Sequence, residues 1–351
     1  MAKEFNSQFL SACIIKQECR ASLLGNDSNP LIEKAKTLLN EGKVDRVLGW
    51  KAGDFSYDVT PALFTNVESL EKDFVYNDFS GANFSKYLVK ETRKQDAGKI
   101  LVFLKPCDTY SFNQLLTEHR FDREKVYAVG IPCDGMVDVT FIKEKVGDGI
   151  ISVESGDVIK VETLYDGVKE IAKADVLAER CKNCKSKKHV AYDELIGEEG
   201  EVIDNNRFDE VAKLEAMTAD ERFAFWQNEL SRCIRCNACR DVCPACTCEK
   251  CVFGNPNSGV ENKAAANSFE EKMFHIIRAF HVAGRCTDCG ECSRVCPQNI
   301  PLHLLNRKFI KDINAFYGDY QAGEEVGSRA PLTNYTKEDL EPSEAVNKEE
   351  K

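Results

Sequence analysis

The sequence predicts two regions of different architecture: an α/β N-terminal domain with a parallel βαβ core, followed by a mainly α-helical, cysteine-rich domain. Up to about residue 200, helical patterns alternate with short apolar runs, whereas from about residue 206 capped helical patterns accompany repeated cysteine motifs. A chain of 351 residues has room for about two domains. We expect the α/β domain over residues 1–205, the helical domain over 206–315 and an extended acidic tail over 316–351.

The α/β domain is predicted from alternating helical and strand-like patterns. Ile100–Leu104 and Val126–Ile131 are continuous apolar runs rich in branched residues, which is typical of strands buried on both faces of a parallel sheet. A helical pattern at about 109–119 joins them, so the three segments predict a βαβ unit. Earlier segments continue the alternation: a helix over 31–39, an apolar run over 44–50 and a helix over 83–94.

Both buried runs end in the same tripeptide. Lys99–Asp108 matches Lys125–Asp134 at an offset of 26 residues, and each segment closes on Pro-Cys-Asp. Because ligands gather outside the carboxyl ends of parallel strands, we expect Cys107 and Cys133 at the same edge of the sheet. The alternative is a pair of buried structural thiols, since free cysteine is commonly buried.

Capped helices with apolar stripes predict the second domain. Thr218–Glu221 has the spacing of a capping box, and Ser268–Glu271 repeats it before a helix that should end at Gly284. A third helix is expected after Pro301. We expect the apolar stripes of these three helices to face the core: Phe223, Trp226 and Leu230; Phe269, Met273, Ile276, Ile277 and Phe280; and Leu302, Leu305 and Phe309.

The 17 cysteines are the unusual feature of the composition. Met1–Phe5 lacks the basic, apolar and small-residue segments of a secretory signal, so we expect a cytoplasmic protein whose reduced thiols bind metal. A net charge of −11 argues against a nucleic-acid binder. No apolar run approaches the roughly 18 residues of a transmembrane helix, so membrane insertion is not expected.

One cysteine motif occurs twice at an offset of 53 residues. It reads Cys-x2-Cys-x2-Cys-x3-Cys-Pro, the bacterial ferredoxin run, in which closely spaced thiolates wrap a 4Fe-4S cluster. The cysteines of the two runs are Cys233, Cys236, Cys239 and Cys243, and Cys286, Cys289, Cys292 and Cys296. Zinc is the alternative, but a four-cysteine zinc site needs only two Cys-x2-Cys pairs and this region has four.

The fourth cysteine of each run is expected to serve the other cluster, as in two-cluster ferredoxins. The resulting ligand sets are Cys233, Cys236, Cys239 and Cys296 for cluster one, and Cys286, Cys289, Cys292 and Cys243 for cluster two. The 42 residues between Cys243 and Cys286 are too many for the linker of a compact βαββαβ ferredoxin. They favour an α-helical dicluster ferredoxin domain.

A third set of thiols combines the pair Cys181 and Cys184 with Cys107 and Cys133 from the two strand ends. Four soft ligands suit a third 4Fe-4S cluster or tetrahedral zinc, and the absence of a metal is the remaining alternative. His189 is a candidate to replace one of these cysteines.

Other cysteines have no assigned role. Cys246, Cys248 and Cys251 follow the first run directly and are either packing thiols near the clusters or three ligands of a further metal. Cys13 and Cys19 stand apart near the start of the chain. Neither GxGxxG nor GxxxxGK occurs, so a Rossmann dinucleotide turn and a P-loop are not supported, and no Ser/His/Asp or paired-carboxylate arrangement is recognisable.

The N-terminal motifs resemble the beta subunits of deazaflavin-coenzyme hydrogenases and formate dehydrogenases. The segments that carry the resemblance are Pro106–Asp108, Gly130–Gly135, Cys181–Cys184 before an Asp-x-x-Ile-Gly-type segment, Asn77–Leu88, Leu39–Val44 and Gly49–Trp50. The resemblance implies a 4Fe-4S cluster at the corresponding cysteines beside a flavin, FAD or FMN, for which no sequence motif is present. The two ferredoxin runs are similar to the dicluster half of formate dehydrogenase beta-type and anaerobic sulfite reductase A-type subunits. Together the resemblance covers about residues 30–315.

Cluster ligands without a recognisable group for substrate chemistry predict an iron–sulfur electron-transfer subunit of a larger anaerobic oxidoreductase, of the hydrogenase, formate dehydrogenase or electron-bifurcating type. Its partners would be other redox subunits, including one that contains flavin or metal. The alternatives are a flavin-containing catalytic subunit that reduces a deazaflavin or nicotinamide coenzyme, and a non-redox assembly or regulatory protein. Scattered aromatic residues such as Tyr320, after the last predicted helix, are expected to lie along a partner subunit or in a frayed terminus.

Overall fold

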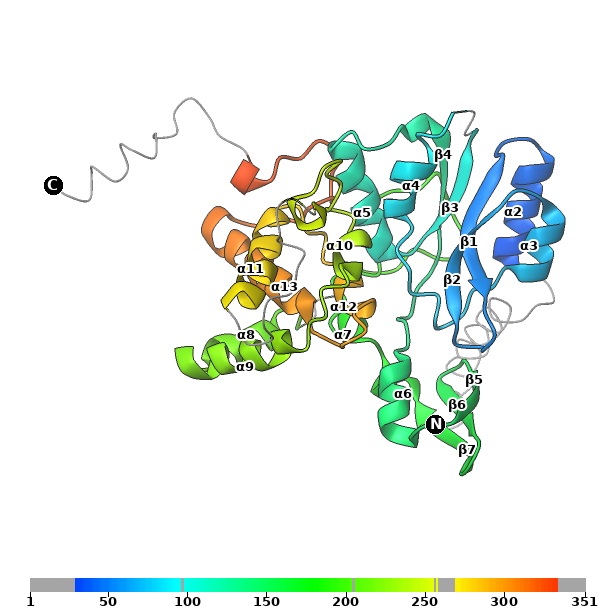
Figure 1. Cartoon of the computed structure of the whole chain (residues 1–351). Coiled ribbons are helices and arrows are strands. Elements are labelled where there is room, and N and C mark those ends of the chain that lie inside the picture. Colours follow the sequence, from blue (N-terminus) through cyan, green and yellow to red (C-terminus); the bar gives the residue numbers. More distant parts are fainter. Residues whose placement is uncertain (1–28, 96–97, 204–205, 256, 258–268, 334–351) are drawn as a thin grey trace, which may run out of the picture.

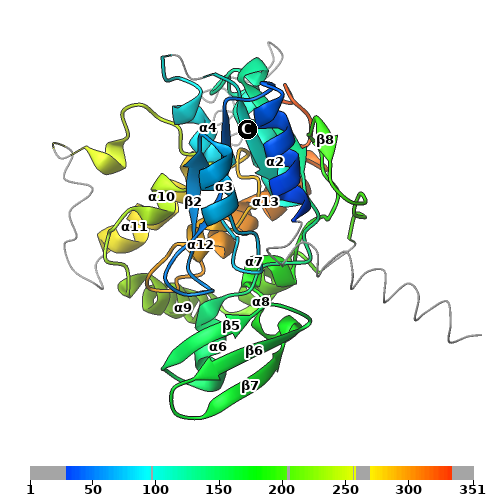
Figure 2. The ribbon, with the colours of Figure 1, turned by 90° about the vertical axis from the view of Figure 1, so that its right-hand side faces the viewer.

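A computed structural model describes residues 29–95, 98–203, 206–255, 257 and 269–333 (Figure 1). Cys13, Cys19, the expected cap at Ser268 and the acidic residues from 336 onward lie outside the described residues. Figure 1 shows a sheet flanked by helices, with a second, helical body against one side of it. A smaller unit of a helix and a three-stranded sheet extends away from both, as Figure 2 shows.

The described residues form a five-stranded main sheet in the order β2-β1-β3-β4-β8. The strands are β1 Arg46–Ala52, β2 Val59–Phe64, β3 Ile100–Leu104, β4 Val126–Gly130 and β8 Glu194–Leu195. Strands β1, β3, β4 and β8 run parallel, and β2 pairs antiparallel with β1. Because Leu104 pairs with Gly130, both Pro-Cys-Asp segments leave the sheet at the same edge. The predicted parallel βαβ core is confirmed.

Helices cover both faces of this sheet (Figure 1). They are α2 Pro30–Asn40 and α3 Val67–Asp73 on one face, and α4 Ser85–Glu91 and α5 Pro106–Thr117 on the face toward the helical body. Strand β3 is buried along its whole length, as its apolar sequence predicts. Helix α5 begins at Pro106, earlier than the expected Thr109, because proline suits the first helical turn and Asp108 accepts a hydrogen bond from the backbone of Lys105.

A small antiparallel sheet follows β4, and the sequence patterns did not predict it. The chain forms α6 Val139–Val146, then β5 Ile150–Glu154, β6 Val158–Thr163 and β7 Gly167–Ala172. Strand β6 alternates exposed and buried residues, and its Ile159 and Val161 pack in one cluster with Ile142 of α6. The chain then returns through the short helix α7 Glu179–Lys182, which brings the Cys181–Cys184 pair back to the main sheet.

The second body is mainly helical, as predicted. Its helices are α8 Asp209–Ala216, α9 Ala219–Ser231, α10 Ala238–Asp241, α11 Phe269–His281, α12 Glu291–Arg294 and α13 Leu302–Tyr317. The Thr218–Glu221 capping box of α9 is formed, and α13 begins after Pro301 as expected. Leu230 is buried, but Phe223 is exposed, contrary to the prediction. No described helix has the length and apolar character needed to cross a membrane.

The prediction that Ile277 and Phe280 of α11 face the core is wrong, whereas Met273 and Ile276 of the same stripe are half-buried. Phe280 is 61% exposed and Ile277 is 37% exposed, whereas Phe274 is buried. The inward side of the helix also carries His275 and Arg278, which line cavities at the cysteine loops. Because this side of α11 meets thiols and polar groups, hydrophobicity alone selects the wrong face.

Residues 318–333 pack back onto the α/β domain. Gly323 lies so close to α5 that a Cβ atom there would come 1.8 Å from the carbonyl oxygen of Tyr110. The amide of Gly327 donates a hydrogen bond to Thr117 Oγ1 at 2.9 Å, and the Tyr320 hydroxyl donates to a backbone carbonyl at 3.0 Å. This segment, including Tyr320, is therefore anchored within its own chain, while Phe316 and Tyr317 before it are exposed. Docking along a partner stays a prediction.

Candidate metal centres

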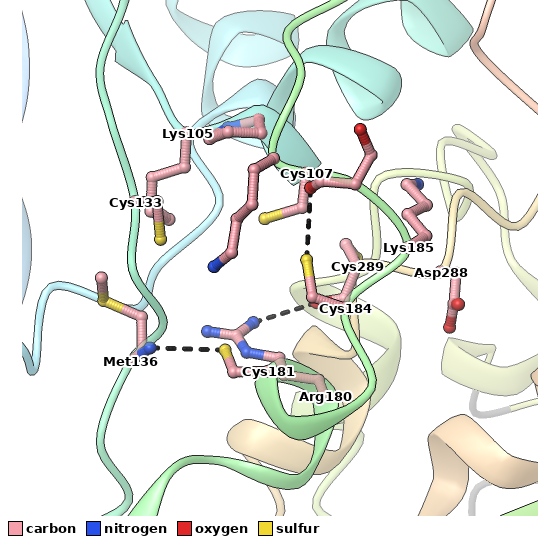
Figure 3. A pocket seen from close by; sticks show the side chains of 13 residues that line it. Lys105, Cys107, Cys133, Met136, Arg180, Cys181, Cys184, Lys185, Asp288 and Cys289 are labelled. Carbon is pink, nitrogen blue, oxygen red and sulfur yellow. Dashed lines mark hydrogen bonds between the residues drawn. The ribbon is translucent and has the colours of Figure 1, made fainter. Parts of the chain in front are cut away.

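The four thiols of the third set line one cavity, although they come from three separate segments (Figure 3). Cys107 lies in the first turn of α5, Cys133 follows β4, and Cys181 and Cys184 belong to α7 and the loop after it. Figure 3 shows their sulfur atoms around the same space. Cys289, from the second ferredoxin run, lines this cavity as well. The structure therefore joins the third set to a ferredoxin run.

Local backbone structure accounts for this convergence. The parallel strands place Cys107 and Cys133 at one edge, but only the first is followed directly by a helix. After Cys133, Gly135 adopts a φ of 109°, a region that favours glycine, and the chain turns away from the sheet. The amide of Met136 then donates a hydrogen bond to Cys181 Sγ at 3.4 Å, which ties the Cys-x2-Cys pair to the strand end.

Positive side chains surround the third set. Those lining the cavity are Lys105, Arg180, Lys185 and Lys187. Lys105 is 1% exposed, forms an ion pair with Asp108 at 2.8 Å and lies 4.8 Å from the centre of the Trp50 ring. Burial raises the pKa of the Cys107 thiol, Asp108 raises it further, and Lys105 opposes both effects. These cations would balance the negative charge that thiolates carry once they bind metal.

The described thiols do not close around a single metal ion. A zinc site needs its ligands about 2.0–2.3 Å from one ion. Within the part of the chain that the structure describes, no three Cys, His, Asp or Glu side chains are gathered closely enough to hold one metal ion. This holds for the ferredoxin runs and for the third set alike.

His189 is not in place to replace a cysteine. Its buried ring has Nε2 at 3.0 Å from the carbonyl oxygen of Ile131 and Nδ1 at 2.8 Å from Glu199 Oε1. Both ring nitrogens therefore have protein partners, and the ring does not line the thiol cavity. This histidine fixes the loop after the Cys-x2-Cys pair to the end of β4.

The two ferredoxin runs approach each other through their last cysteines. One cavity is lined by three cysteines of the first run and the last of the second: Cys233, Cys236, Cys239 and Cys296. A neighbouring cavity is lined by Cys243, the last of the first run, and Cys292 of the second. His275 lines both cavities and lies between the two sets. The first cavity brings together the four thiols expected for cluster one, whereas only two of the four expected for cluster two share the second cavity. The exchange of the last cysteines between the clusters stays a prediction.

Left-handed backbone conformations wind both runs in the same way. Arg235 and Asn237 have φ angles of 56° and 62°, and the equivalent Asp288 and Gly290 have 56° and 66°. Each run then forms a short helix, α10 or α12, before its last cysteine. Residues other than glycine seldom adopt this conformation, so its repetition indicates that the direction of the thiols is under constraint.

Buried charges join the second run to the α/β domain. The Glu291 carboxylate is fully buried, binds Arg180 and Arg294, and accepts a hydrogen bond from the backbone of Asn83 at 3.2 Å. Burial raises the pKa of Glu291, but the charges of Arg294 and Arg180 outweigh this and lower the pKa to about 2. Arg180 also donates to the carbonyl oxygen of Cys289 at 3.0 Å.

A second cluster of buried charges binds the loop of the second ferredoxin run at Asp288. Arg307 of α13 is 1% exposed and donates to Asp288 at 2.8 Å, and Arg207 donates to the same carboxylate at 2.7 Å. Lys185, from the third set, binds the carbonyl oxygen of Thr287. The third set and the second run are therefore parts of one connected structure.

Comparison with known proteins supports a dicluster domain in the helical body. Residues 229–300 match the family model of the 4Fe-4S dicluster domain. The beta subunit of F420-dependent formate dehydrogenase from Methanocaldococcus jannaschii is 25% identical over 335 residues, with 79% of this chain and 87% of that protein covered. The chain is a homologue of such beta subunits. The beta subunit of F420-dependent formate dehydrogenase 1 from Methanococcus maripaludis is 26% identical over 370 residues, covering 84% of this chain and 92% of the relative.

The beta-subunit homology and the dicluster match support two 4Fe-4S clusters in the helical body. Thiols that line shared cavities, with arginine beside them, fit such clusters. A chain of the F420-reducing [NiFe] hydrogenase complex from Methanosarcina barkeri matches 56% of this chain and 74% of its own length, at 17% identity and a TM-score of 0.37. That likeness is too weak to inform the site.

The sequence motifs did not point to the polar groups around the thiols. Arg278 donates a hydrogen bond from Nη1 to Cys239 Sγ at 2.7 Å, and His275 lies between the two ligand sets. Neither belongs to a cysteine motif, and both sit on a helix that was assigned the wrong face. The lysines near Cys184 had a usable signal, since Lys185 and Lys187 follow that cysteine directly in the sequence.

Proposed function

We propose that this chain is the iron–sulfur electron-transfer subunit of a formate dehydrogenase-type oxidoreductase complex, with a third 4Fe-4S cluster on Cys107, Cys133, Cys181 and Cys184. The observation that carries the proposal is the cavity that Cys289 shares with these four thiols. When bound, the clusters supply one-electron transfer. The contribution of the chain is to hold the third set next to the second ferredoxin run through Arg180, Lys185 and Glu291.

The surroundings of the third set favour a cluster over zinc. Its thiols are spaced too widely for one ion in the described residues, as are those of the ferredoxin runs. Its four lining cations would also compensate a group of higher negative charge. A cluster here would lie beside cluster two, whereas zinc would take the site out of the electron path.

Iron and acid-labile sulfide, measured on the anaerobically purified complex, test the third cluster. We expect the Cys181→Ser/Cys184→Ser variant to contain about four irons and four sulfides fewer per beta chain than the wild type. Lys182→Ala is the matched control, because it changes the same loop without removing a thiol, and it should retain the wild-type content. An unchanged iron content in the Cys181→Ser/Cys184→Ser variant, or the loss of one zinc instead of iron, would contradict the proposal.

The partner class follows from the relatives, which are named as subunits of F420-dependent formate dehydrogenases. We expect this chain to bind a formate-oxidising subunit and to receive electrons from it. Adding formate to the anaerobic complex should reduce the clusters, as followed by EPR, whereas formate should leave the beta chain alone oxidised. Reduction by formate without a partner, or the lack of any co-purifying redox subunit, would contradict this assignment.

A second candidate function is reduction of a deazaflavin coenzyme by this chain itself, with a bound flavin. The names of the two relatives, which include F420 dependence, favour it. Reconstituting the beta chain separately with FAD and FMN, followed by gel filtration, measures flavin retention. Stoichiometric flavin and F420 reduction by the pre-reduced chain would support this function. If the chain neither retained flavin nor reduced F420, it would remain an electron-transfer subunit.

A further inference from the structure

A cavity of about 360 Å³ lies beside the first ferredoxin run and is separate from the cavities of the three thiol sets. The cysteines that follow the run, Cys246, Cys248 and Cys251, line it together. Its other walls come from α4, α10 and α11, through Lys86, Asp241 and His281 among others. Residues that had no role in the sequence motifs therefore converge on one space.

The loop that carries these cysteines is fixed to its surroundings. The amide of Cys246 donates a hydrogen bond to the carbonyl oxygen of Cys243 at 3.0 Å. Arg285 donates to the carbonyl oxygen of Ala245 at 2.9 Å, and the Lys86 ammonium binds the carbonyl oxygen of Cys246. The start of the loop is thus held at Ala245 and Cys246 by α4, by the segment after α11 and by the end of the ferredoxin run.

The charge around this cavity is similar to that around the third thiol set. Four cations line it, namely Lys86, Arg240, Arg278 and Arg285. The acids that line it are Asp241 and Glu249, and Glu118 lies behind Arg285 at 2.7 Å. Cations therefore outnumber acids on the wall, so the cavity is suited to a group with net negative charge.

We propose that this cavity is a fourth iron–sulfur site, with Cys246, Cys248 and Cys251 as thiolate ligands. Three cysteines in the spacing Cys-x-Cys-x2-Cys supply closely spaced soft ligands, as the first three cysteines of a ferredoxin run do. A single zinc ion fits poorly, because no three such side chains among the described residues close around one ion. His281 also lines the cavity and is the candidate for the remaining ligand.

With the fourth site, the ligands of cluster two would adjoin two further sites instead of one. Cys246 adjoins Cys243, which is assigned to cluster two, while Cys289 of the same ligand set lines the cavity of the third set. The ligands of cluster two are thus in contact with both outer sites. Cys248 is exposed, so the new site reaches the surface, where a redox partner can approach. The inference rests on the proposed function only through the assignment of Cys243.

The variant Cys248→Ser/Cys251→Ser tests the site without disturbing the contact between Cys246 and Cys243. In the anaerobically purified complex we expect about four irons and four sulfides fewer per beta chain than in the wild type, with the EPR signals of the ferredoxin clusters retained. Thr247→Ala is the matched control within the same loop and should keep the wild-type content. An unchanged iron content, or loss of one zinc instead of iron, overturns the proposal.

Thiol labelling gives a second, independent readout. Because Cys248 is exposed, iodoacetamide should modify it readily unless iron holds it. We expect protection of Cys248 in the native complex and labelling after an iron chelator is added, as read by mass spectrometry. Labelling of the native complex, or a disulfide among these three cysteines, overturns the fourth site. Loss of the ferredoxin signals from the wild-type chain would instead count against the proposed function.

Discussion

The two ferredoxin runs share their spacing and backbone conformation but differ in what surrounds them. At the offset of 53 residues, Arg235 of the first run corresponds to Asp288 of the second, and Ala238 corresponds to Glu291. The second run therefore carries two buried carboxylates where the first carries a half-buried arginine and a methyl group. The same motif is built into two different electrostatic settings.

This difference separates an inner run from an outer one. Thr287 of the second run is 4% exposed, whereas its counterpart Ile234 is 55% exposed, and Cys236 is exposed as well. The carboxylates of the second run are bound by arginines from the α/β domain and α13, so this run is the internal link to the third thiol set. The cysteine spacing determines the cluster chemistry, and the residues between the cysteines determine where each cluster lies.

Removing the last cysteine of a run is the strongest way to test this comparison. Cys296→Ser changes the second run, but the cavity places this thiol with Cys233, Cys236 and Cys239. We therefore expect loss or conversion of the outer cluster, measured by iron content and EPR on anaerobic protein. The reciprocal variant, Cys243→Ser, should damage the inner cluster. Damage confined to the Cys286–Cys292 cluster in the Cys296 variant would show that the ligands are not exchanged.

Glu291→Ala should destabilise the inner run more than any comparable change in the outer run. It leaves Arg180, whose side chain is 8% exposed, without its carboxylate partner. Breaking a buried ion pair costs about 3–5 kcal/mol of the free energy of unfolding. The matched control is Asp241→Asn in the outer run, where the side chain is 62% exposed and about 1 kcal/mol or less is expected.

Anaerobic urea titration followed by circular dichroism measures both variants. A loss at Glu291 no larger than that at Asp241 would remove the distinction between an inner and an outer run. It would also indicate that the contact between the third set and the second run depends on packing more than on charge.

The sequence predicted the parts of the molecule that spacing alone controls. The apolar runs Ile100–Leu104 and Val126–Ile131 became β3 and β4, and the Pro-Cys-Asp repeat placed Cys107 and Cys133 in one cavity. These predictions succeed because parallel strands end at a common edge whatever else surrounds them. The helical character of the second body followed in the same way from caps and periodicity.

The sequence did not predict which neighbour each surface meets. On α11, Phe280 was expected inside and Arg278 was not considered, yet the helix turns Arg278 toward the thiols because that side of it packs against the cysteine loops. The aromatic residues after α13 do not reveal that Gly323 lets the segment around Tyr320 lie directly on α5. A hydrophobic pattern indicates that one face of a helix is buried. It does not indicate whether apolar residues, thiols or another segment of the chain bury that face.

A buried histidine gives the inner run a pH dependence. Burial, and after it the charge of Arg307, lowers the pKa of His303 from 6.5 to about 4, while Nδ1 lies 2.8 Å from Ser293 Oγ. The unfolded chain therefore binds this proton first, and stability falls as the pH drops from 6.5 toward 4. Linkage gives a loss of about 2 kcal/mol between pH 7 and pH 5.

Urea titrations of the wild type and of His303→Gln at pH 7 and pH 5 measure how much of this pH dependence comes from His303. His303→Gln should reduce the difference in the free energy of unfolding between them, even if it lowers stability at both. His119→Asn, which changes an exposed histidine, should leave the difference unchanged. If His303→Gln kept the full pH dependence of the wild type, another group would be responsible for it.

The smallest expected effect concerns hydrogen bonds to the cluster thiols. Arg278 donates to Cys239 at 2.7 Å, whereas the neutral amide of Asn306 lies 3.7 Å from Cys292. A positive donor favours the reduced, more negative state, so Arg278→Met should lower the reduction potential of the outer cluster. For a one-electron couple a tenfold change in equilibrium is about 59 mV, and we expect a shift of this order or less.

The corresponding change in the inner run, Asn306→Leu, should shift the potential of its cluster less, because the lost donor is neutral and distant. Arg278→Lys separates charge from geometry: it keeps the positive charge, so it should retain more of the wild-type potential than Arg278→Met does. Potentiometric titration followed by EPR measures all three variants. A larger shift of the reduction potential in Asn306→Leu would show that charge near the thiols does not distinguish the two runs. The difference between them would then come from the enclosure of the inner run by the α/β domain.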